Sequence, residues 1–256
     1  MRTAVSALTA LLAVAAAAKL KPASEYFDKI CSYTDPKLNE CIKNTVQALR
    51  PKLQEGIKDL GLPSLEPLFI EQLVFEEGSG NYKFRQVMSN VSVFGLSQFS
   101  VQEVKTDLSK YYLEMDMRTP YMRFEGHYEM EGKILQLPIA GNGECVYNFT
   151  GVRTVAYTQG ELVTREGQEY FHVKDLKWKI EVEDAHSHFT NLFNGDKNLG
   201  EATNTFLNEN WKEAFTTFKY LAEDAFGILF KDLANRVYSK FPVKELVKDW
   251  PQGQSS

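Results

Sequence analysis

Hydrophobic residues recur every three or four positions near both ends of the chain, and this spacing predicts helices there. The first stripe covers residues 38 to 60, and Pro51 is expected to break it. The second runs from Leu207 to Val237 and predicts one continuous helix over residues 198 to 239. About 40 residues of helix span roughly 60 Å, more than the width of a compact sphere of this mass. The pattern therefore predicts an elongated molecule.

Between about residue 68 and residue 190, the hydrophobic period changes to two. Residues 111 to 118 place apolar side chains on odd positions and polar ones on even positions. After Thr119 and Pro120 the alternation resumes, now with Met122 and Phe124 on the apolar side. Further strands are expected at 145–149, 152–158 and 176–182. We expect an α+β fold in which an antiparallel sheet with one solvated face wraps against the long C-terminal helix.

Two Asn-x-Ser/Thr sequons, at Asn90 and Asn148, are candidate glycosylation sites and would have to face water. An outward Asn148 places Cys145, Tyr147 and Phe149 inward, in agreement with their chemistry.

Asn90 has the parity of the apolar residues Phe84 and Met88, so an outward Asn90 conflicts with simple alternation. We therefore expect a β-bulge between Phe84 and Asn90 that leaves Val87, Val91 and Val93 inward.

Residues 1 to 18 have the pattern of a secretory signal peptide: one positive charge at Arg2, an uncharged run and an alanine-rich end that offers an Ala-x-Ala cleavage site. A membrane anchor is the alternative, but this run is short and rich in alanine. We expect residues 19 to 256 to form one secreted, extracellular domain without stable membrane insertion.

Because a secreted protein enters an oxidising environment, we expect a disulfide between Cys31 and Cys41. On one helix their Cα atoms would lie roughly 15 Å apart, beyond the limit of about 7 Å. The chain must therefore fold back, and Asp35-Pro36 is the expected helix start, with Cys41 in the second turn. Cys145 remains either as a buried free thiol or as an intermolecular bridge.

The charge balance and the aromatic content restrict the possible partners. The formal net charge is −5, and no cluster of Lys and Arg stands out, which argues against nucleic acid. The chain also holds 17 Phe, 12 Tyr and 3 Trp, a large apolar surface that must be buried against something.

The motifs of common enzyme classes are absent from the sequence: there is no G-x-S-x-G, H-E-x-x-H, P-loop or Rossmann fingerprint. His186 and His188 share a strand face and could in principle bind a metal. Because there is no nearby cysteine or third imidazole, we expect these two histidines to lie at a solvated strand end instead. We predict no enzymatic activity, no metal and no cofactor.

The methionines point to a binding role. Met115, Met117, Met122 and Met130 all fall on the inward faces of consecutive strand segments. Methionine specifies a rigid core poorly but adapts well to an apolar ligand, although a plain core stripe explains the same pattern. Hydroxyls of Tyr111 and Tyr128 on those faces would complete a small-molecule pocket, and a curved sheet around a long helix can enclose a tunnel.

Several short blocks, taken together, resemble the insect juvenile-hormone-binding protein and takeout family over nearly all of the mature chain. They are the Cys31/Cys41 pair, Gly61-Leu62-Pro63 to Pro67-Leu68, Phe94-Gly95-Leu96-Ser97, Gly126-His127-Tyr128 to Gly132, Leu137-Pro138-Ile139 with Gly141 and Gly143, His188 to Gly195, and Asn204 to Trp211.

The resemblance implies a highly curved antiparallel sheet rolled around a long C-terminal helix, enclosing a hydrophobic tunnel that carries a terpenoid hormone, fatty acid or quinone. Hormone carriers of the family have a second disulfide. Cys145 has no visible partner, which resembles the takeout branch.

We predict a secreted, monomeric, non-catalytic carrier of an elongated hydrophobic small molecule. The expected ligand-binding residues are Leu113, Met115, Met117, Met122, Phe124, Tyr128, Met130, Cys145, Tyr147, Phe149, Trp178, Ile180, Trp211, Phe215 and Phe218. One alternative is a secreted interaction protein with a filled core, whose acidic faces bind a protein partner. A secreted hydrolase is a third hypothesis.

Overall fold

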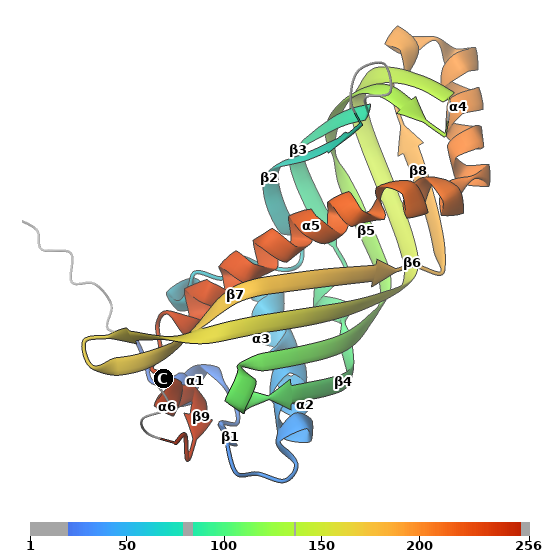
Figure 1. The fold of residues 1–256 in the computed structure, drawn as a ribbon. Helices are drawn as coiled ribbons and strands as arrows, with labels where there is room; N and C mark the ends of the chain where they lie inside the picture. The colour runs from blue at the N-terminus through green and yellow to red at the C-terminus, as the bar shows by residue number, and fades with distance from the viewer. Residues whose placement is uncertain (1–19, 79–83, 136, 252–256) are drawn as a thin grey trace, which may run out of the picture.

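The computed structural model describes residues 20–251, except for 79–83 and 136. The predicted signal peptide lies outside the described residues. The molecule is elongated, and a curved sheet wraps along the long helix α5 (Trp211–Tyr238) (Figure 1). The α+β fold class and the wrapping of the sheet around a C-terminal helix are confirmed.

The main sheet is antiparallel, with strand order β2-β3-β5-β6-β7, and two further strands extend it: β4 pairs with β5, and β8 pairs with β6. Its strands are β2 (Leu68–Glu77), β3 (Phe84–Phe94), β4 (Ser100–Asp107), β5 (Tyr112–Ile134), β6 (Leu137–Arg165), β7 (Gln168–Glu181) and β8 (Asp184–Phe189).

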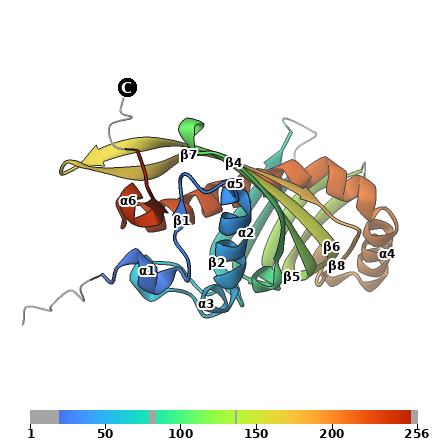
Figure 2. The ribbon, with the colours of Figure 1, turned by 90° about the horizontal axis from the view of Figure 1, so that it is seen from below.

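Helices lie at the two ends of this sheet, and α5 runs along its inner side (Figures 1 and 2). They are α1 (Ala23–Tyr26), α2 (Leu38–Ala48), α3 (Arg50–Glu55), α4 (Lys197–Glu209), α5 and α6 (Val243–Leu246), with 3-10 helices at Lys58–Leu60, Leu96–Gln98, Leu108–Lys110 and Phe193–Gly195. The break predicted at Pro51 is confirmed, because α2 ends at Ala48 and α3 begins at Arg50.

The N-terminal segment is attached by the predicted disulfide and by a small parallel sheet. Cys31 and Cys41 are bonded, with their Cα atoms 5.9 Å apart. Strand β1 (Cys31–Ser32) pairs with β9 (Val247–Lys248). The predicted helix start is wrong: Pro36 lies in a turn, in which the Asp35 carboxylate accepts from the backbone N–H of Lys37 at 2.8 Å. Helix α2 therefore begins later, and Cys41 lies in its first turn.

In the two long central strands, β5 and β6, the sequence parity of the inward-facing residues switches part-way along each strand. In β5, Met115 and Met117 face inward before this level, and Met122 faces inward after it, as the sequence predicts. Strand β6 changes with it, because Gly151 adopts a φ of +58° between Phe149 and Val152, which both face inward.

The predicted β-bulge in β3 is present, but it lies at the end of the expected interval. Pairing with β5 shifts between Ser89 and Ser92, and Asn90 is exposed with a φ of 52°. Val91 and Val93 are buried, as predicted. The inward assignment of Val87 is wrong, because the strand keeps its alternation up to Ser89, so that Gln86 and Met88 are the buried neighbours.

The predicted single C-terminal helix is two helices, because the chain breaks at Asn210. This residue has φ −110° and ψ 24°, and its side-chain amide donates to the Phe206 carbonyl at 2.8 Å. The side chain thus competes with the backbone for that carbonyl. The sequence predicts Asn198 as the helix cap, but Asp196 caps α4, and its side chain accepts from the Leu199 N–H at 3.0 Å. Helix α4 crosses the end of α5 (Figure 1).

The edges of the sheet are hydrogen-bonded by helix side chains. On α4, the Asn208 amide bonds both the N–H and the C=O of Ser187 in β8, at 2.8 and 2.9 Å. Asn204 does the same for Phe189, at 2.9 Å in each case. Four residues of an α-helix rise about 6 Å, and two residues of a strand rise about 6.7 Å. The spacing of the two asparagines therefore matches alternate residues of the strand.

The same arrangement holds the free edge of β7 against α5. Asn235 bonds the N–H and the C=O of Val173 at 2.8 and 3.0 Å. Glu223, only 3% exposed, accepts from the N–H of Ile180 at 3.0 Å and from Lys179 at 2.6 Å.

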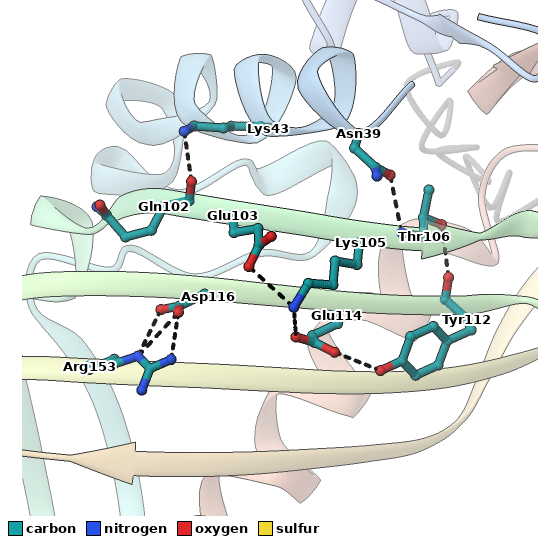
Figure 3. Close-up of polar contacts among 10 residues, drawn as sticks. All are labelled: Asn39, Lys43, Gln102, Glu103, Lys105, Thr106, Tyr112, Glu114, Asp116 and Arg153. Carbon is teal, nitrogen blue, oxygen red and sulfur yellow. Dashed lines mark hydrogen bonds and ion pairs between the residues drawn. The ribbon is translucent and has the colours of Figure 1, made fainter. Parts of the chain in front are cut away.

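At the opposite edge, α2 lies beside β4 (Figures 2 and 3). Gln47 accepts from the Val101 N–H at 2.9 Å, and Asn39 accepts from the Thr106 N–H at 3.1 Å. These contacts give partners to strand groups that would otherwise be open to another chain.

The outer face of the sheet carries the predicted polar residues. Arg153 on β6 donates to Asp116 on β5 at 2.8 Å, and Lys105 on β4 pairs with Glu114 at 2.9 Å (Figure 3). The Lys105 ammonium and the Tyr112 hydroxyl hold the pKa of the Glu114 carboxyl below its ordinary value. Such surface pairs contribute little stability each, so the apolar inner face must supply most of it.

Asn208→Ala is expected to lower the free energy of unfolding by about 1 to 3 kcal/mol, because it leaves two Ser187 backbone groups without their partner. Urea unfolding followed by circular dichroism measures this. Asn198→Ala is the matched control, since Asn198 is exposed on the same helix. An equal, negligible effect of the two substitutions would show that the side-chain contacts to β8 do not stabilise the fold.

Candidate ligand-binding site

A cavity of about 520 Å³ lies between the inner face of the sheet and helix α5. Its lining on α5 extends from Trp211 to Tyr238, a helix length of roughly 40 Å. Opposite, the lining comes from β2, β3, β5, β6, β7 and β8, and α2, α3 and the 62–65 loop add apolar side chains at one side. The volume is within the range of small-molecule sites, about 300 to 1,000 Å³.

Twelve of the predicted ligand-binding residues line this cavity. They are Leu113, Met115, Met117, Met122, Phe124, Tyr147, Phe149, Trp178, Ile180, Trp211, Phe215 and Phe218. The strands and α5 thus bring together residues more than a hundred positions apart in the sequence.

Three predicted residues, Tyr128, Met130 and Cys145, lie instead in solid core beside the cavity. The Tyr128 hydroxyl donates to the Thr190 carbonyl at 2.6 Å, and burial raises the pKa of this tyrosine to about 12. Alternation correctly gave their inward direction, but all three lie within the buried core, where the ring centroids of Tyr128 and Phe189 are 5.2 Å apart.

Tyr111 also does not supply a hydroxyl to the cavity. It has a φ of 54° in the turn before β5, where its ring packs near Phe171 and Trp250. The strand assigned to it begins one residue later, so alternation does not apply to this position.

A hydrogen-bonded polar pair lies in the cavity wall. The Gln86 side-chain N–H donates to the Tyr147 hydroxyl oxygen at 2.8 Å. The Tyr147 hydroxyl can in turn donate to the Gln86 amide oxygen, which lies 3.1 Å away. Burial raises the pKa of Tyr147 well above its ordinary value. The two side chains satisfy each other, so the surrounding wall stays apolar. Sequence reasoning missed Gln86, although it shares the parity of Phe84 and Met88.

Sequence reasoning also missed two large rings of α5. Phe230 stacks on Trp178 with ring centroids 4.6 Å apart, and Phe226 lies against Phe124 at 5.8 Å. The hydrophobic stripe predicted from the sequence runs through Leu221, Ala225 and Leu229, none of which lines the cavity, although its later residues Leu233 and Val237 do. Residues one position later, Ala222, Phe226 and Phe230, are the ones that line it.

Cys145 is a free, buried thiol in the structure. It is 1% exposed and donates to the Gly126 carbonyl at 3.5 Å. Burial raises its pKa to about 12. In this conformation the thiol is not accessible for an intermolecular disulfide.

The two sequons both face outward. Asn90 is exposed at the bulge, and Asn148 is half-buried and accepts a hydrogen bond from the Tyr121 hydroxyl. Glycosylation of either residue stays a prediction.

Within the described ranges, no group of three or more His, Cys, Asp or Glu side chains is arranged to hold a metal ion. His186 and His188 are both exposed on one face of β8, and His186 also borders the cavity. Nor is any helix in the described part of the chain long and apolar enough to cross a membrane.

Comparison with known proteins agrees with this architecture. The family model described as haemolymph juvenile hormone binding protein matches residues 7–248. The chain belongs to this family.

Relatives in the family are moderately similar to the chain. It is 28% identical to the circadian clock-controlled protein daywake of Drosophila yakuba, over 83% of this chain and 85% of that protein. A putative beta-carotene-binding protein of Schistocerca gregaria is 22% identical over 58% of this chain and 59% of its own. Among solved structures, Takeout 1 of Epiphyas postvittana superimposes with a TM-score of 0.75 at 27% identity, covering 86% of this chain and 99% of that one.

The resemblance to the juvenile-hormone-binding protein and takeout family is therefore confirmed. This is a family of binding proteins rather than enzymes, so the expectation of a non-catalytic protein is confirmed with it and the hydrolase hypothesis is set aside.

The environment of Cys145 predicts its reactivity. A thiol reacts as the thiolate, and a raised pKa keeps this thiol neutral throughout the physiological range, as burial favours the uncharged form. We expect Ellman's reagent at pH 8 to detect almost no thiol in the native protein and about one per chain in guanidinium chloride. Rapid native labelling would contradict the buried placement.

Proposed function

We propose that this protein is a secreted, non-catalytic carrier that holds one elongated hydrophobic molecule in the cavity between the sheet and α5. The observation that carries the proposal is the cavity itself: its wall is almost entirely apolar and follows α5 from one end to the other. Family membership and a relative named for binding beta-carotene, a long hydrocarbon, support the same class of ligand.

The lining explains how affinity would arise. Each buried CH₂ group of a ligand contributes about 0.8 kcal/mol, so a long chain gains affinity from length rather than from specific hydrogen bonds. Met115, Met117 and Met122 adapt their side chains to different ligand shapes. We therefore propose fatty acids, terpenoids and quinone-like lipids as the ligand class.

Secretion belongs to the same proposal. We propose that residues 1 to 18 are removed as a signal peptide and that residues 19 to 256 act as one monomeric extracellular domain. The Cys31–Cys41 disulfide supports an oxidising compartment, and the family description refers to haemolymph.

The alternative of an interaction protein depends on a filled core. The cavity favours the carrier over this alternative, because inward residues such as Met117 and Phe149 are only half-buried and leave space between the sheet and the helix.

Met117→Trp tests the role of the cavity. We expect the indole to occupy ligand volume and to weaken binding of methyl palmitate by about tenfold or more, while the fold is retained. Displacement of the fluorescent probe N-phenyl-1-naphthylamine measures the affinity.

Tyr157→Trp is the control, since Tyr157 is exposed on the outer face of β6 and should leave binding unchanged. Equal binding by both variants and the natural sequence would place the ligand elsewhere and overturn the proposal.

A further inference from the structure

The cavity wall contains one formally charged side chain. Of the described residues that line it, Lys219 is the single Lys, Arg, Asp or Glu. It lies in the cavity-facing stripe of α5, between Phe215 one turn before and Ala222 one turn after. Its half-buried side chain lets the aliphatic stem join the wall while the ammonium reaches its margin.

The position of Lys219 along the cavity follows from the contacts of α5 with β7. Asn235 bonds Val173 and Glu223 bonds Ile180, so the helix and the strand run in opposite directions. Lys219 precedes Glu223 by one turn, roughly 6 Å. It therefore lies beyond Ile180, near the end of β7, where the chain passes to β8 and Val182 and Ala185 line the cavity.

Among the described residues, the Lys219 ammonium has no carboxylate within ion-pair distance. The nearest candidate on its own helix, Glu223, is already bound by Lys179 at 2.6 Å and by the Ile180 N–H. A chain with 34 acidic and 29 basic residues thus leaves one cation unpaired at the margin of an apolar cavity. By contrast, the polar side chains of Gln86 and Tyr147 deeper in the wall satisfy each other.

We infer that the cavity prefers long-chain monocarboxylic acids, with the carboxylate paired to the Lys219 ammonium at the β7–β8 end and the hydrocarbon chain inside. This inference rests on the proposed carrier function. A carboxylate is costly to bury without a partner, so an acid must keep its head at the margin. A single ammonium is a point charge that matches a single carboxylate.

The test compares palmitate with methyl palmitate as competitors for N-phenyl-1-naphthylamine, because the two differ in charge but share the hydrocarbon chain. The natural sequence should bind palmitate more tightly than the ester. Lys219→Gln should weaken palmitate binding by roughly fivefold, the scale of a partly exposed ion pair, and leave the ester unchanged. Lys219→Arg should retain the preference.

Lys231→Gln is the matched control: it removes a half-buried lysine of the same helix that does not line the cavity. It should change neither affinity. Equal binding of acid and ester by the natural sequence, or an unchanged preference in Lys219→Gln, would overturn this inference and leave the carrier function standing. Failure of both lipids to bind would overturn the carrier function and the inference together.

Discussion

Backbone groups at the edge of a β-sheet need hydrogen-bond partners, and in this molecule side chains of the helices provide many of them. Asn204 and Asn208 hold β8, Asn235 and Glu223 hold β7, and Asn39 and Gln47 hold β4. Polar contacts along the margins thus fix the curved sheet to the helices. With the sheet fixed to the helices at these edges, a cavity of about 520 Å³ remains between its inner face and α5.

An interior held open in this way favours apolar, adaptable side chains. Methionines and aromatic rings from the strands face Trp211, Phe215 and Phe218 from α5, and many of the aromatic residues of the sequence lie on these two facing surfaces. The solid core lies elsewhere, around Tyr128 and under α4, where it keeps the sheet rigid. The interior thus divides into a packed end and a cavity that follows α5.

Much of this architecture could be predicted from the sequence, because strand alternation and disulfide geometry are local rules. The faces of β5 and β6 and the bulge near Asn90 followed from alternation, and the fold-back of the chain at the expected Cys31–Cys41 pair followed from the limit on its Cα distance. The rest depends on what lies opposite a residue. Periodicity directed Tyr128 inward but could not show that Phe189 packs against its ring, and a hydrophobic stripe could not reveal the break at Asn210.

Native mass spectrometry of the protein purified from a secreting host tests the central claim most directly. The account predicts that the folded chain carries a hydrophobic adduct, that organic extraction removes it, and that added long-chain lipid restores one molecule per chain. A single mass, unchanged by extraction and by added lipid, would contradict the account, because it would mean that the space between the sheet and α5 holds no ligand.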